Sequence, residues 1–118
     1  MILIIGGAYQ GKEAYVREHF PDGCDVILDY HLRIRKQLQE GKDPMEEAKQ
    51  LVLSSLKCAD KELVIVCDEI GSGVVPMDGF ERQYRESTGR VCCYFAEESE
   101  KVIRVIAGIG TVIKVVSE

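Results

Sequence analysis

Hydrophobic residues occur along the chain either in short continuous runs or at helical spacing, and the two patterns alternate. Continuous apolar runs rich in β-branched residues predict strands that are buried on both faces, as in a parallel sheet. These strands are expected at residues 2–5, 25–29 and 62–67. Apolar positions recurring at i, i+3 and i+4 predict amphipathic helices. These helices are expected at residues 12–20, 30–40, 44–58 and 78–98.

The carboxyl-terminal part has a different pattern. Residues 101–106 predict a strand, glycines follow at 108 and 110, and residues 111–116 predict another strand. This end is either a β-hairpin at the sheet edge or one strand that bends at the glycines. With the alternating strands and helices, it predicts a single domain over residues 1–118. The expected class is a three-layer α/β domain of P-loop, Rossmann-like type, with a mostly parallel sheet and a C-terminal β-hairpin.

The first predicted strand runs directly into a glycine-rich turn and a helix start. Gly6, Gly11 and Lys12 match the G-x-x-x-x-G-K part of a phosphate-binding P-loop, whose amides and lysine contact the phosphates. The next position should carry a Ser or Thr that binds Mg²⁺, and here it is Glu13. A tight strand-to-helix turn without phosphate binding is the alternative. The candidate nucleotide-binding residues are Gly6, Gly7, Ala8, Tyr9, Gln10, Gly11, Lys12 and Glu13.

Acidic residues follow two of the predicted strands. Asp68 and Glu69 come after the 62–67 run, where a Walker-B carboxylate would hold Mg²⁺ in a chain that also has a P-loop. Asp29 lies at the carboxyl end of its own predicted strand, the edge at which open α/β sheets bind ligands. His31 is close to the start of the following helix and could face the same edge.

Composition narrows the class of protein. The 118 residues carry a formal net charge of −5, which argues against a nucleic-acid binder that relies on bulk electrostatics. The sequence has no run long enough to predict a transmembrane span. The five cysteines form no C-x-x-C pair, so we expect structural thiols, with Cys67 packed as a small buried hydrophobe. A cytoplasmic protein is expected.

Several short motifs together resemble one enzyme family. Residues 2–12 are similar to a strand followed by G-G-A-R-S-G-K, and residues 69–76 resemble E-V-G-x-G-I-V-P. Residues 82–91 resemble R-x-[FY]-R-D-x-x-G-R-V, and residues 107–110 resemble S-G-I-G. These motifs are those of the bifunctional adenosylcobinamide kinase/adenosylcobinamide-phosphate guanylyltransferase family of cobalamin biosynthesis.

The resemblance implies a nucleotide-dependent activity. It implies ATP or GTP with Mg²⁺ as the cofactor, phosphoryl transfer to the adenosylcobinamide hydroxyl, and a homo-oligomer. The candidate catalytic residues are Lys12, Asp68, Glu69, Arg82 and Arg85, with Asp68 and Glu69 as metal ligands. In these roles Lys12 contacts the phosphates, and Arg82 or Arg85 offsets the charge that develops during transfer.

The chain also departs from the family pattern. Glu13 replaces the loop serine, and Asp68 stands where the family usually has Asn. The family's middle region is shortened here, and no histidine stands directly before Lys42, whereas the family has its guanylylated histidine just before a similar motif. Guanylyl transfer is therefore not expected. Two further readings stay open: a non-catalytic relative with a structural or regulatory role, and a P-loop enzyme that acts on another small substrate.

Overall fold

Five strands form one sheet in the computed structural model, which describes residues 1–20, 24–57, 61–70 and 78–116. The strand order is β2-β3-β1-β4-β5, with β1 to β4 parallel to one another and β5 antiparallel to β4. The strands are β1 (Ile2–Gly6), β2 (Cys24–Ile27), β3 (Glu62–Asp68), β4 (Lys101–Ile106) and β5 (Ile109–Val115). The mostly parallel sheet is therefore confirmed.

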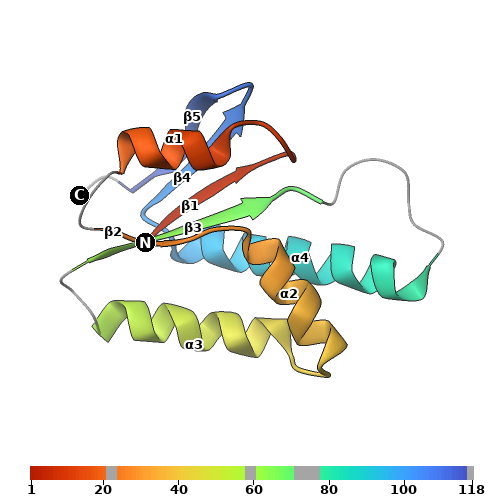
Figure 1. Cartoon of the computed structure of the whole chain (residues 1–118). Coiled ribbons are helices and arrows are strands. Elements are labelled where there is room, and N and C mark those ends of the chain that lie inside the picture. The colour runs from red at the N-terminus through yellow and green to blue at the C-terminus, as the bar shows by residue number, and fades with distance from the viewer. Residues whose placement is uncertain (21–23, 58–60, 71–77, 117–118) are drawn as a thin grey trace.

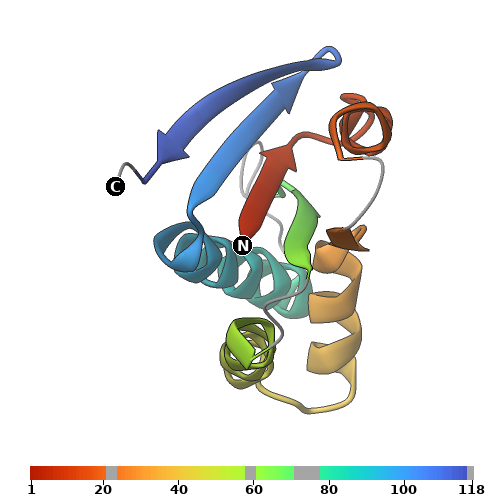
Figure 2. The same cartoon turned by 90° about the vertical axis from the view of Figure 1, so that its left-hand side faces the viewer.

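Helices cover both faces of this sheet, which gives the predicted three layers. Figures 1 and 2 show α1 on one face, and α2, α3 and α4 together on the other. The helices are α1 (Lys12–His19), α2 (Tyr30–Gln39), α3 (Pro44–Lys57) and α4 (Gly79–Glu98). None of the helices in these described ranges is both long and apolar enough to cross a membrane.

The apolar strands supply both halves of the core because successive side chains point to opposite faces. In β3, Leu63, Ile65 and Cys67 join the cluster that includes residues of α2, α3 and α4, while Val64 and Val66 join the cluster that includes Val16 of α1. All five are at most 8% exposed. A continuous hydrophobic run is thus what a strand between two helical layers requires.

The connections place a topological switch point between β1 and β3. The chain leaves β1 through α1 toward β2, and it leaves β3 through α4 toward β4, in the opposite direction along the sheet. Right-handed crossovers that run in opposite directions must lie on opposite faces, and α1 and α4 do so. Ligands of open α/β sheets bind at such a switch point, outside the carboxyl ends of the strands.

The carboxyl-terminal strands form a hairpin rather than one bent strand. β4 and β5 pair from Ile106 with Ile109, so the turn consists of Ala107 and Gly108. Their φ angles of 51° and 77° match a two-residue turn in which both central residues have positive φ. The turn lies one residue earlier than the spacing of the glycines predicted. Gly110 belongs to β5, where an added Cβ would lie 2.4 Å from the ring of Tyr15.

Candidate functional site

The strand register brings the glycine-rich loop beside the acidic end of β3. Gly6 at the end of β1 pairs with Asp68, and the N–H of Glu69 donates to the Gly6 carbonyl at 2.7 Å. A Cβ on Gly6 would lie 2.4 Å from the carbonyl oxygen of Val105 in β4, so the loop leaves the sheet at a point that only glycine fits.

Lys12 lies within this loop rather than in solvent. Its side chain is 7% exposed, and Nζ donates to the Gly7 carbonyl oxygen at 2.6 Å and lies 2.7 Å from Asp68 Oδ1. The lysine therefore links the loop to β3. The sequence predicted both residues as site residues, and the structure brings them together.

Asp68 and Glu69 point in different directions. Asp68 lies on the same face of β3 as Val66 and lines the P-loop cleft, whose lining also includes Lys12, Asp29 and residues 8–11. Glu69 makes an ion pair with Arg104 of β4 at 3.2 Å and does not line this cleft; it lines a second cavity, whose lining also includes Asp68 and Cys92. Because consecutive residues of an extended strand point to opposite faces, the two predicted metal ligands do not enter the P-loop cleft together.

His31 is the site residue that the sequence indicated least. It is buried near the start of α2, where its Nδ1 accepts a hydrogen bond from the N–H of Asp68 at 3.1 Å and its Nε2 lies 3.4 Å from Asp68 Oδ2. The sequence showed only that this residue closely follows the end of a strand. Its pairing with Asp68 depends on β2 lying beside β3, which the sequence order does not give.

Asp29, His31 and Asp68 form a cluster of possible cation ligands among the described residues. Each offers one ligand atom, and these atoms lie within 4.8 Å of one another. The two carboxylates are of the oxygen type that Mg²⁺ prefers. A backbone N–H is always a donor, so His31 Nδ1 must be the acceptor, and in the neutral ring the proton is on Nε2. The carboxylates of Asp29 and Asp68 fit a divalent cation better than the imidazole does.

The β4–β5 turn contacts the glycine-rich loop through hydrogen bonds to Gln10. The N–H of Ala107 donates to Gln10 Oε1 at 2.7 Å, and the N–H of Gly108 donates to the Gln10 carbonyl oxygen at 2.7 Å. Among the described residues, Tyr9, Asp29 and Ala107 are the non-glycine positions with positive φ. Tyr9 and Asp29 line the cleft and Ala107 binds its loop, so the strained backbone gathers around one site, as is common at functional sites.

Glu13 makes an ion pair beside the cleft. Its carboxylate forms an i, i+4 ion pair with Arg17 on the exposed side of α1, while the residue still contributes to the lining of the cleft. This pairing reduces the repulsion that Glu13 would exert on phosphates, although it supplies no hydroxyl for Mg²⁺. The cleft has a volume of about 380 Å³.

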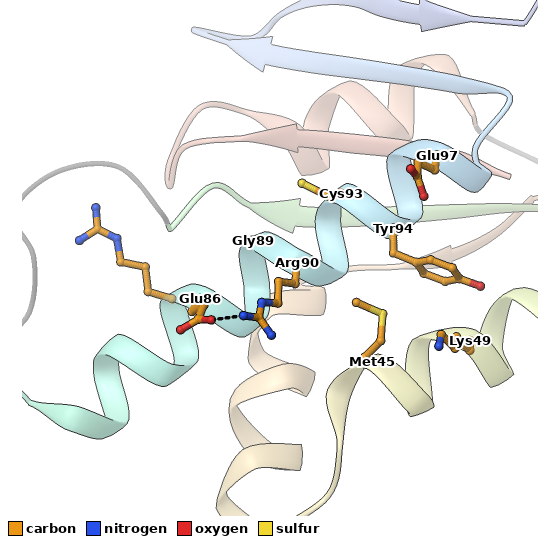
Figure 3. A pocket seen from close by; sticks show the side chains of 9 residues that line it. Met45, Lys49, Glu86, Gly89, Arg90, Cys93, Tyr94 and Glu97 are labelled. Carbon is orange, nitrogen blue, oxygen red and sulfur yellow. Dashed lines mark ion pairs between the residues drawn. The ribbon is translucent and has the colours of Figure 1, made fainter.

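Arg82 and Arg85 lie on α4 and do not line the P-loop cleft. Arg85 lines a wider groove of about 860 Å³ between α3 and α4. In Figure 3, Met45 and Lys49 on α3 lie across this groove from Arg90 and Tyr94 on α4. The catalytic roles expected for the two arginines thus remain predictions. Residues 71–77 of the family-like motif lie outside the described residues.

Cys67 is buried, as the sequence predicted, and it lies next to a second thiol. Its Sγ is 3.5 Å from Cys92 Sγ on α4, and the described cysteines are all free thiols. The hydrogen bond shared with Cys67 lowers the pKa of Cys92, while this bond and burial raise the pKa of Cys67. Cys92 lines the cavity that also contains Glu69 and has a volume of about 310 Å³.

The fold and this cleft define a P-loop α/β protein, and comparison with known proteins specifies the family. The family model for cobinamide kinase / cobinamide phosphate guanyltransferase (CobU) matches residues 22–113, and the chain belongs to this family. The match begins after the P-loop, so the loop is assigned from its own residues and geometry.

Two curated proteins are similar to this chain. The bifunctional adenosylcobalamin biosynthesis protein CobU of Salmonella typhimurium strain LT2 is 35% identical over 69 residues, which cover 58% of this chain and 38% of that protein. The protein of the same name from Escherichia coli strain K12 is 35% identical over 68 residues, which cover 58% of this chain and 37% of that protein. The matched segments thus span less than two fifths of these relatives.

Proposed function

We propose that this protein binds ATP or GTP with Mg²⁺ in the P-loop cleft and transfers the terminal phosphoryl group to the hydroxyl of adenosylcobinamide. Membership of the cobinamide kinase family supports the substrate class. The observation that carries the proposal is the position of Lys12, whose Nζ lies between the Gly7 carbonyl and Asp68 at the switch point of the sheet.

In this role Lys12 exchanges partners when nucleotide binds. Its ammonium group leaves Asp68 Oδ1 and contacts the phosphates, together with the amino-terminal N–H groups of α1. Asp68, with Asp29 beside it, would hold the Mg²⁺ ion of the nucleotide through carboxylate oxygens. The bound cation would offset charge on the transferring phosphoryl group.

Guanylyl transfer is not included in this proposal. The chain lacks a histidine directly before Lys42-Asp43-Pro44, where the family resemblance would place the guanylylated residue. His31 is a poor substitute, because it is buried and both of its ring nitrogens face Asp68.

Calorimetric titration with ATP and GTP, each with and without Mg²⁺, tests nucleotide binding. Lys12→Ala should abolish binding, while Lys57→Ala at an exposed position of α3 should leave it unchanged. Transfer is then measured as the appearance of phosphorylated adenosylcobinamide. A wild-type protein that shows no affinity at millimolar nucleotide would refute the proposal.

A non-catalytic, structural or regulatory role is the second candidate, and Glu13 favours it. The residue removes the hydroxyl that the P-loop normally gives to Mg²⁺. If the wild-type protein lacks Mg²⁺-dependent binding, Glu13→Ser should restore it when this position is the single defect. A homo-oligomer is proposed from the family resemblance, and analytical ultracentrifugation tests it.

A further inference from the structure

The carboxylate of Asp68 has two partners of different kinds. Lys12 contacts Oδ1 from the loop that binds phosphate, at the end of a long and flexible side chain. His31 faces Oδ2 from α2, and its ring is fixed by burial and by the hydrogen bond from the Asp68 N–H. The contact with Lys12 can therefore be exchanged for another partner, whereas the contact with His31 is part of the packed structure.

We infer that His31 is a positioning residue that fixes the orientation of the Asp68 carboxylate for the Mg²⁺–nucleotide complex. The inference rests on the proposed function. When Lys12 moves to the phosphates, Oδ1 becomes available to the cation, and His31 continues to hold Oδ2. Without His31, the carboxylate could rotate or follow the ammonium group of Lys12. Residues that orient metal ligands typically change metal affinity or activity by about 10–100-fold when they are replaced.

His31 acts through Asp68 and does not bind the cation itself. Its Nδ1 lone pair accepts from the Asp68 N–H, and its Nε2 therefore carries the proton in the neutral ring. Coordination through Nε2 would require loss of that proton and of the Nδ1 hydrogen bond. An imidazole ligand would also favour softer ions such as Zn²⁺ or Ni²⁺ over Mg²⁺. Titration with each metal ion alone separates the two roles.

The test compares His31→Gln, His31→Asn and His31→Ala with the wild-type protein. The Gln amide reaches the position of Nε2 and can donate to Oδ2, whereas the shorter Asn amide reaches only the position of Nδ1. The measured quantity is the nucleotide dissociation constant in EDTA divided by the dissociation constant in Mg²⁺. We expect His31→Gln to keep this ratio within about threefold of the wild-type value. His31→Asn and His31→Ala should lower the ratio about tenfold. Affinity in EDTA should stay the same in all four proteins.

Each outcome bears on the inference. The inference would be overturned if His31→Ala left the ratio of dissociation constants unchanged. It would also be overturned if His31→Asn kept the same ratio as His31→Gln. Loss of affinity in EDTA along with the loss in Mg²⁺ would show a merely structural role. Tighter binding of Zn²⁺ or Ni²⁺ by the wild-type protein than by His31→Gln would make His31 a ligand. If the wild-type protein binds no nucleotide, the proposed function fails, and the inference about His31 falls with it.

Discussion

Replacement of Lys12 by Met should destabilise the ligand-free protein, apart from any effect on nucleotide binding. The ammonium group is buried and satisfied by the Gly7 carbonyl and by Asp68. Breaking an enclosed ion pair costs about 3–5 kcal/mol, but the Asp68 side chain is 19% exposed and keeps its contact with His31. Partial hydration of the remaining carboxylate reduces the expected loss to about 2 kcal/mol. For a domain of this size that corresponds to a decrease in Tm of about 8 °C.

A double-mutant cycle with Asp68→Asn measures whether the pair itself is responsible. Urea unfolding of the wild-type protein, both single variants and the double variant gives the coupling energy, which we expect to be about 1–2 kcal/mol. Lys57→Met, at an exposed position of α3, is the matched control and should change stability by less than about 0.5 kcal/mol. If the stability losses of the two single variants sum to the loss of the double variant within about 0.5 kcal/mol, the contact between Lys12 and Asp68 is not a source of stability.

Three further predictions concern the scaffold. Gly6→Ala should lower the free energy of unfolding in urea by about 3 kcal/mol, because the added Cβ would meet a carbonyl oxygen of β4. Gly89→Ala has open space around its Cβ in α4 and should raise the free energy of unfolding by about 0.5–1 kcal/mol. Equal effects of the two substitutions would contradict this prediction. Ala107→Asn should raise Tm by about 4 °C because Asn tolerates the positive φ, and an unchanged Tm would argue against strain there. Burial raises the pKa of Tyr30 and of Tyr84 to about 12, so unfolded tyrosines ionise first and stability should fall as pH rises above about 10. Ultraviolet titration should show a late phase that Phe variants reduce, and a single transition near pH 10 would contradict it.

The fold was predictable from local patterns because each element carries a strong one. The continuous run in β3 predicted a strand buried on both faces, and Asp78 caps α4 by accepting hydrogen bonds from the N–H groups of Phe80 and Glu81. The sequence left the hairpin open because glycines at 108 and 110 fit both a turn and a bend. The turn consists of Ala107 and Gly108, and alanine rarely adopts the positive φ that Ala107 has there, so the sequence carries no signal for this position.

The candidate site was predictable only where a residue stands in a local motif. The P-loop spacing predicted Lys12, and the end of the apolar run predicted Asp68. Glu69 was grouped with Asp68 because adjacent acidic residues look equivalent in a sequence, although a strand turns them to opposite faces. His31 could not be assigned because its partner is 37 residues away and the pairing depends on strand order.

The geometry connects the P-loop to the part of the chain that matches the family. The loop precedes the matched residues 22–113, yet its contacts are made with residues inside that range. Lys12 pairs with Asp68, the Gln10 side chain accepts from Ala107, and a Cβ on Gly11 would lie 3.2 Å from the Cα of Gly108. These contacts bring together a buried lysine, an acidic strand end and a hairpin turn with positive φ angles. The matched segment therefore supplies the surface on which the loop rests, and the loop and this segment form one structural unit.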